Sequence, residues 1–153
     1  MTTPAVVPTK YAGDDGDYLI AKIDRSGALR SETVSVTVPD ASSVGTVVGL
    51  VPFRKGARFN YGASSIYAAD LDTATSVTLN VGYVYDDNTT YTNDDDAFAT
   101  LSTAAQAGGF VTFDEVAGFD FDAEADGWIA VTIAGGATTT EGDIDAQIAL
   151  TYD

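Results

Sequence analysis

The chain of 153 residues contains no cysteine and no histidine. Without cysteine it can form neither disulfides nor thiolate metal sites. Without histidine it lacks the usual general base, so hydrolysis through a Ser–His–Asp or Cys–His arrangement is excluded. A pair of carboxylates could still cleave a glycoside, and this is the one enzymatic alternative left open, although no two acidic residues stand out as that pair. We therefore expect a protein that is not an enzyme and uses no cofactor.

Long apolar runs are absent as well. The longest uncharged apolar stretch, about Thr46 to Phe53, is far shorter than the roughly 20 residues of a membrane-spanning helix. The first residues include two prolines and no continuous apolar segment of the signal-peptide type. The sequence thus predicts synthesis in a cytoplasm and no membrane partner.

Positive charge is scarce and confined to the first part of the chain. Arg58 is the last of seven basic residues, whereas residues 59–153 carry seventeen acidic residues. The formal net charge is −16. A surface this negative repels nucleic acid and anionic lipid, so we expect no nucleic-acid partner. Two interpretations of the asymmetry stay open: the charge keeps an abundant protein soluble, or the basic part faces negatively charged protein.

The chain is rich in alternating β-branched and aromatic residues. Val34, Val36 and Val38 fall on one face of their segment, and hydroxyl side chains fall on the other. Such alternation predicts strands at 17–24, 31–39, 45–53, 58–69, 76–85, 109–116, 127–136 and 143–152. The last two are expected to pair as a hairpin around 134–143. The fold class is therefore mainly β, a single-domain antiparallel β-sandwich or jelly roll.

Two segments depart from this alternation. Residues 1–16 contain Pro4 and Pro8 and show no periodicity, so we expect an extended N-terminal arm before a domain at 17–153. Residues 94–107 begin with acids and are rich in alanine, which predicts one short helix inserted in the β fold.

Alternating acids between 120 and 126 raise the question of a calcium site. Asp122, Glu124 and Asp126 match the opening of an EF-hand loop, because hard cations bind several oxygens on a short segment. Ile133, however, stands where the loop needs a glutamate, and no flanking helix is predicted. A strand with a solvated polar face explains the same pattern, so we expect no metal and keep the three acids as weak candidates. A second acidic group could gather around a cation if its loop folds back on itself: Asp86, Asp87, Asp94, Asp95 and Asp96. Loop tips and helix starts favour acids without a cation, which explains this group as well.

The last basic residues form a cluster, R-K-G-A-R, in a predicted tight turn around Gly56. The turn is either simply solvated or makes an electrostatic contact with an acidic neighbour, such as a second copy of the chain. Together with the arm, it supplies the candidate interface residues Arg54, Lys55, Arg58, Pro4, Pro8 and Tyr11.

The order of segments over about residues 45–153 resembles small virion structural proteins of tailed bacteriophages, of the kind that decorate or cement the capsid. The resemblance lies in G-L-V-P-F-R-K-G-A-R-F, S-V-T-L-N-V-G-Y-V-Y-D-D, the expected Ala-rich helix D-A-F-A-T-L-S-T-A-A-Q-A-G-G, and the final G-W-I-A-V-T-I-A-G-G with D-I-D-A-Q-I-A-L-T-Y. It implies a compact β-sandwich, a homotrimer, the major capsid protein as partner and a place on the outer capsid surface of a virion, after synthesis in the cytoplasm of a bacterial host. The arm would then be a mounting segment that adds a strand to a capsid protein.

A second function stays open beside this one. A phage fibre domain or a carbohydrate-binding β-sandwich would recognise a surface glycan through exposed aromatic rings. The candidates are Tyr61, Tyr67, Tyr91 and Trp128. This alternative expects the four rings to line one groove of a protein able to act as a monomer, whereas a cement protein self-associates and binds shells.

Overall fold

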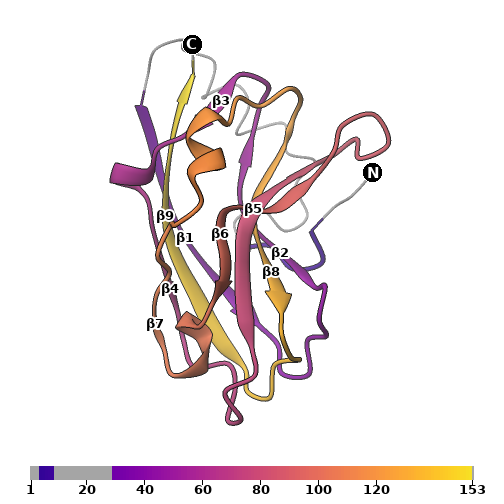
Figure 1. Cartoon of the computed structure of the whole chain (residues 1–153), viewed down its shortest axis with the longest axis vertical. Helices are drawn as coiled ribbons and strands as arrows, with labels where there is room; N and C mark the ends of the chain where they lie inside the picture. Colours follow the sequence, from indigo (N-terminus) through magenta and orange to yellow (C-terminus); the bar gives the residue numbers. More distant parts are fainter. Residues whose placement is uncertain (1–3, 9–28, 153) are drawn as a thin grey trace.

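The computed structural model describes residues 4–8 and 29–152, and its strands form two stacked antiparallel sheets (Figure 1). The first sheet consists, in order, of β2 (Val47–Phe53), β8 (Gly127–Ala134), β5 (Thr78–Tyr85) and β6 (Asp94–Ser102). The second consists of β1 (Leu29–Val38), β9 (Gly142–Tyr152), β4 (Ser65–Ala68) and β7 (Gly109–Phe110), with β3 (Ala57–Phe59) also paired to β9. The predicted fold class, a mainly β sandwich or jelly roll, is confirmed.

The core lies between the sheets and is built from the inward face of each strand. The alternation predicted for β1 is seen, since Val34, Val36 and Val38 are buried and the residues between them are exposed. Strand β9 pairs with β1 without a break in register and turns its own apolar face inward. The largest fully buried side chains include Leu50, Ile66, Leu79, Phe98, Ile129, Ile133, Ile144 and Ile148. Each contributes about 2 kcal/mol through removal from water.

Residues 4–8 run alongside the edge of β2. The amide of Val6 donates to the carbonyl oxygen of Val47 at 3.3 Å, and the amide of Gly49 donates to the carbonyl oxygen of Val6 at 2.7 Å. A side chain at Gly49 would overlap the ring of Pro4, so the glycine makes this close approach feasible. The strand predicted at 17–24 lies outside the described residues.

The described residues also form short 3₁₀ helices: η2 (Tyr61–Ala63), η3 (Ala104–Gln106) and η4 (Val116–Asp120). Helix η2 divides the stretch 58–69, for which one strand is predicted, into β3 and β4. The side-chain oxygen of Asn60 accepts a hydrogen bond from the amide of Ala63 at 3.1 Å and caps the turn, which explains the interruption.

The helix predicted at 94–107 is wrong, because its first nine residues form strand β6. Helical propensity loses here to tertiary pairing: β6 satisfies the hydrogen-bonding groups along one edge of β5 and buries Phe98 completely. The ring of Phe98 stacks on Phe59 of the opposite sheet, with centroids 4.2 Å apart. Just before β6, the side-chain oxygen of Asn93 accepts a hydrogen bond from the amide of Tyr85 at 2.7 Å.

The hairpin predicted around 134–143 is also wrong, since β8 and β9 belong to different sheets. The spacing of apolar residues along two strands is the same whether the strands pair in one sheet or face each other across the core, so it does not distinguish the two arrangements. The connection between the two strands is fixed by side chains. The Thr138 hydroxyl, for example, donates to the carbonyl oxygen of Pro39 at 2.9 Å.

Candidate functional site

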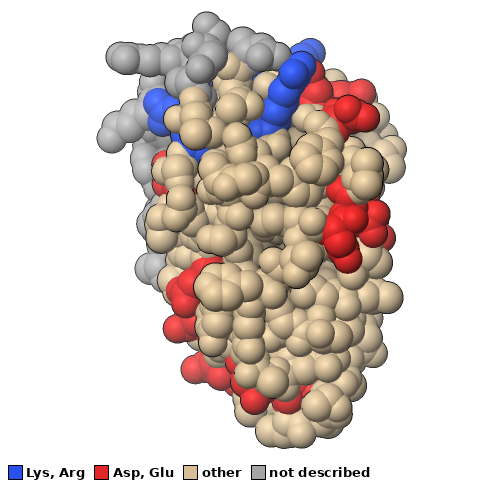
Figure 2. Space-filling view, turned by 60° about the vertical axis from the view of Figure 1, so that its left-hand side comes forward, with Lys and Arg blue, Asp and Glu red and all other residues tan. Residues whose placement is uncertain are grey.

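The basic turn between β2 and β3 lies beside the acidic segment that follows η4. Arg58 donates a hydrogen bond to the carboxylate of Asp122 at 3.2 Å, and both side chains are about half exposed. The backbone amide of Lys55 donates to the carboxylate of Asp126 at 3.0 Å. The structure thus joins two candidate regions that are separate in the sequence. Figure 2 shows the same proximity, with blue basic residues next to red acidic ones at the upper end of the molecule.

The three weak calcium candidates do not converge on one point. Asp122 and Asp126 hold the basic turn, and Glu124 contributes its backbone amide to the hydroxyl of Tyr85 at 3.2 Å. In the described part of the chain, the carboxylates that approach one another closely enough for a shared cation are instead Asp94, Asp95 and Asp96, with oxygens within 4.8 Å. Partial burial, followed by the neighbouring Asp96, raises the pKa of Asp94. These acids lie where the register between β5 and β6 shifts.

The remaining candidate interface residues have different environments. Pro4 and Pro8 are buried within the chain itself, and Arg54 is half-buried, with its backbone amide 3.4 Å from the hydroxyl of Tyr152. Tyr11 lies outside the described residues. The exposed part of the candidate interface is therefore the turn around Lys55 and Arg58.

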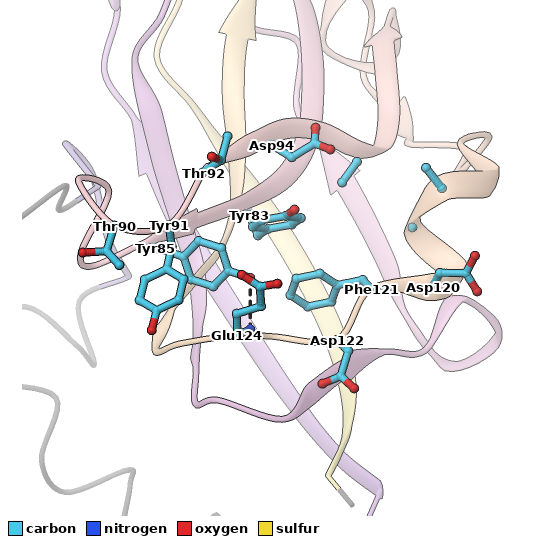
Figure 3. Close-up of a pocket in the computed structure, with 13 residues that line it drawn as sticks. Tyr83, Tyr85, Thr90, Tyr91, Thr92, Asp94, Asp120, Phe121, Asp122 and Glu124 are labelled. Carbon is cyan, nitrogen blue, oxygen red and sulfur yellow. Dashed lines mark hydrogen bonds between the residues drawn. The ribbon is translucent and has the colours of Figure 1, made fainter.

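A cavity of about 400 Å³ opens next to this turn, between the loop joining β5 to β6 and the stretch 117–124 (Figure 3). Its aromatic lining consists of Tyr83, Tyr85, Tyr91 and Phe121. The rings of Tyr83 and Phe121 lie 4.5 Å apart, and Tyr85 lies 5.2 Å from Tyr83 and 5.4 Å from Tyr91. These aromatic residues belong to the hydrophobic core or pack against it, and at the cavity they border solvent.

The cavity is strongly negative. Among the described residues, its lining includes Asp94, Asp120, Asp122 and Glu124 and no basic residue. Figure 3 shows Glu124 rising between the rings of Tyr85 and Phe121, while the carboxylates of Asp120 and Asp122 point outward. Burial raises the pKa of Tyr83 to about 12, and the neighbouring Tyr85, Asp94 and Glu124 add to the shift.

The four aromatic residues considered for glycan binding do not share one groove. Only Tyr91 of the four lines this cavity. Tyr61 donates its hydroxyl proton to the carbonyl oxygen of Glu115 at 2.7 Å, and Trp128 packs near Gly49, outside the lining. Alternation along 76–85 predicts that Tyr83 and Tyr85 lie on the apolar face of their strand. It does not predict that they line a cavity, because the loop and the stretch 117–124 that complete the lining are distant in sequence.

A third feature is the stretch that crosses from one sheet to the other after β7. The amide of Val111 donates to the carbonyl oxygen of Ile66 in β4 at 2.9 Å, and the amide of Glu115 donates to that of Phe98 in β6 at 3.3 Å. The crossing closes one side of the sandwich. The strand predicted over 109–116 therefore exists only at Gly109–Phe110.

Large apolar side chains at the two ends of this crossing, in β7 and in η4, face solvent. Phe110, Val116 and Phe119 are 70%, 77% and 67% exposed, and the ring of Phe119 stacks on Tyr61 at 4.3 Å. Figure 2 turns this side of the molecule, with β4 and β7, toward the viewer and shows a broad surface that carries few charged side chains. We call the surface formed by Phe110, Val116 and Phe119 the apolar side.

Comparison with known proteins places the fold among phage capsid structures. No protein-family model matches the chain, and no curated protein matches it. A chain of the capsid of Ralstonia phage GP4 superposes with a TM-score of 0.62 and 22% identity, covering 85% of this chain and 88% of that one. A chain of the cyanophage Pam1 capsid asymmetric unit gives a TM-score of 0.60 and 20% identity, covering 84% of this chain and 87% of that one. The protein thus has a β-sandwich fold that also occurs in phage capsids. No helix among the described residues is long and apolar enough to cross a membrane.

Proposed function

We propose that this chain is a non-enzymatic structural protein of a bacteriophage virion, which decorates the outer surface of the capsid and stabilises the shell. The observation that carries the proposal is the extent of the fold likeness. More than four fifths of this chain corresponds to more than four fifths of chains in two phage capsids. A likeness of nearly whole chains supports a similar architectural task more strongly than a shared motif would.

The distribution of charge and apolar surface supports assembly with other proteins. A molecule with a net charge of −16 repels its own copies, so subunits would meet through surfaces of low charge. The apolar side is such a surface, and burying it would remove two exposed phenylalanines from water. We assign it to contacts between copies in a homotrimer.

The basic turn is assigned to the shell, with the major capsid protein as partner. Lys55 and Arg58 lie at an exposed corner, where an acidic partner would add to the attraction already provided by Asp122. The arm is part of the same proposal only beyond Pro8, since residues 4–8 are already engaged by β2 of the same chain. Tyr11 stays a candidate contact for the capsid protein.

The test is binding of the purified protein to empty shells of the virus that encodes it. We expect saturable co-sedimentation and a higher melting temperature of the decorated shells. A protein that neither sediments with the shells nor changes their melting temperature would contradict the proposal. Native mass at low and high salt tests the oligomer, with three times the chain mass of 15.9 kDa as the expected value.

A further inference from the structure

The cavity beside the basic turn combines aromatic faces with an inward carboxylate. Tyr83 and Tyr91 are half-buried, so part of each ring remains open to the cavity, and the buried Phe121 also lines it (Figure 3). Glu124 is exposed and rises between Tyr85 and Phe121. An aromatic face attracts a cation through its negative quadrupole, and a carboxylate accepts the hydrogen bonds that a cationic group donates.

Other classes of ligand fit this lining less well. An anion would be repelled, because the described part of the lining holds four carboxylates and no basic residue. A purely apolar ligand would cover Glu124 without giving it a hydrogen bond, which costs free energy. A guanidinium or ammonium group meets both requirements at once, since it can lie on a ring and donate to the carboxylate.

The molecule itself shows a guanidinium bound by a carboxylate of this lining, since Arg58 contacts Asp122. Lys55 lines an adjoining hollow together with Tyr91, Asp122 and Glu124. Tyr83 and Phe121 line the cavity and not that hollow, so the position beside them is open to a basic side chain supplied from outside the chain. At about 400 Å³ the cavity is within the range of roughly 300–1,000 Å³ that is usual for ligand sites, so it has room for an arginine and part of its backbone.

We propose that this cavity binds an arginine or lysine side chain on a basic segment of a partner protein. The choice of a protein partner rests on the proposed virion function, whereas the choice of a cationic group rests on the lining alone. Glu124 accepts the hydrogen bonds, and Tyr83 and Tyr91 offer ring faces to the alkyl stem and the charged head.

The experiment titrates the full-length protein with the capped tripeptide acetyl-Gly-Arg-Gly-amide and follows the tyrosine ring signals by NMR. We expect shifts of Tyr83, Tyr85 and Tyr91, and a dissociation constant that rises about tenfold in Glu124→Gln. Asp145→Asn is the matched control, because it removes one exposed carboxylate from β9, outside the cavity lining. It should leave the dissociation constant unchanged within about twofold, since only screened long-range attraction is lost. Melting curves should show both variants folded.

The remaining arms separate other ligands. The same tripeptide with citrulline in place of arginine should not shift the rings. Equal binding by the citrulline peptide, equal weakening in Glu124→Gln and Asp145→Asn, or ring shifts with a neutral oligosaccharide instead of the peptide would each overturn the proposal. If spermidine bound more tightly than the peptide, the proposed protein partner would be wrong and a free polyamine would be the ligand. Shell binding is measured separately. If the protein bound the peptide but no shell, the proposed virion function would be contradicted and the proposed cation site would stand.

Discussion

Arg58 and Asp122 are 64 residues apart in sequence, and their side chains meet at 3.2 Å on the molecular surface. Because both are half exposed, the pair contributes little to folding, roughly 0.2–1 kcal/mol. We expect the pair to matter mainly because it fixes the position of Arg58 in the basic turn, which we assign to the contact with the shell. Replacing Lys55 and Arg58 together by glutamate removes this attraction and adds a repulsion of similar size, so it should lower the free energy of unfolding, measured in urea, by at most about 2 kcal/mol.

The same double variant should bind shells much more weakly at low salt than the unmodified protein does. The difference should shrink as salt screens the contact, because screening acts on exposed charges. Unchanged binding at low salt would leave the turn as a solvated loop with no role in assembly.

The apolar side gives a prediction about self-association. Val116→Ser combined with Phe110→Ser should reduce the oligomer to a single chain in a native-mass measurement at micromolar concentration. The fold should persist, since both side chains are more than two thirds exposed. Thr112→Ala, an exposed substitution on the same crossing, is the control and should leave the oligomer intact. An oligomer that survives the double substitution would move the subunit contact to another surface.

Gly118 is a site where added volume should damage the fold. A methyl group there would overlap the hydroxyl of Tyr61 and the ring of Phe98, so Gly118→Ala should destabilise the protein by about 2 kcal/mol. Gly62→Ala is the matched control, because the nearest atom to its new methyl group would be the Asn60 side-chain oxygen at 3.6 Å. Urea unfolding measures the difference in stability between the two variants. Similar midpoints would show that the backbone near η4 shifts to accommodate the added methyl group.

A segment of this fold can be predicted from the sequence when its own residues determine its structure, and not when distant residues do. Strand β1 could be predicted because burial of Val34, Val36 and Val38 repeats with the period of a strand. Strand β6 could not, since its alanines favour a helix locally and only the pairing with β5 and the stacking of Phe98 on Phe59 favour a strand. The sheet to which β9 belongs could not be predicted either, because alternation is the same on both sides of a core.

The candidate sites show the same division. The basic turn and the acidic run are visible as composition, but their contact through Arg58 and Asp122 depends on the path of the chain between them. Tyr83 and Tyr85 follow the alternation of the core and line a cavity because the end of β5 is left open to the stretch 117–124. Sequence identified which residues are charged or aromatic, and tertiary structure decided which of them face each other.

Tyr83 provides a prediction at high pH. Its neutral form is favoured in the folded state, so the stability that it contributes is complete below the ordinary tyrosine pKa near 10 and is lost as the pH rises through about 12. The absorbance change of tyrosinate should show a late component that Tyr83→Phe removes. Tyr67→Phe should keep that component, because Tyr67 is an exposed residue of β4, outside the cavity. A late component that survives Tyr83→Phe would assign it to a different buried tyrosine.

Asp72 connects two loops at one end of the sandwich. Its buried carboxylate accepts hydrogen bonds from the amides of Ala74 and Val77, both at 2.8 Å, and from the amide and hydroxyl of Ser76. The Thr139 hydroxyl, in the connection between β8 and β9, donates to the same carboxylate at 3.2 Å. These donors, with the amides of Val77 and Ala74 contributing most, lower the pKa of Asp72 far below its usual range. The carboxylate must be charged to accept all of these bonds.

Asp72→Asn keeps the size of the side chain but turns an NH₂ group toward backbone N–H donors, so it should lower the melting temperature at pH 7 by roughly 4–8 °C. Because the folded pKa is depressed, the stability from Asp72 is complete above the unfolded value near 4 and is lost as the pH falls toward the folded value. The difference in melting temperature between Asp72→Asn and the matched variant Asp145→Asn should therefore be largest at neutral pH and shrink between about pH 4 and 2. Both variants lose one negative charge, so repulsion within the acidic protein cancels in the comparison. A difference that stays constant down to pH 2 would mean that Asp72 stabilises the loops through packing and not through its charge.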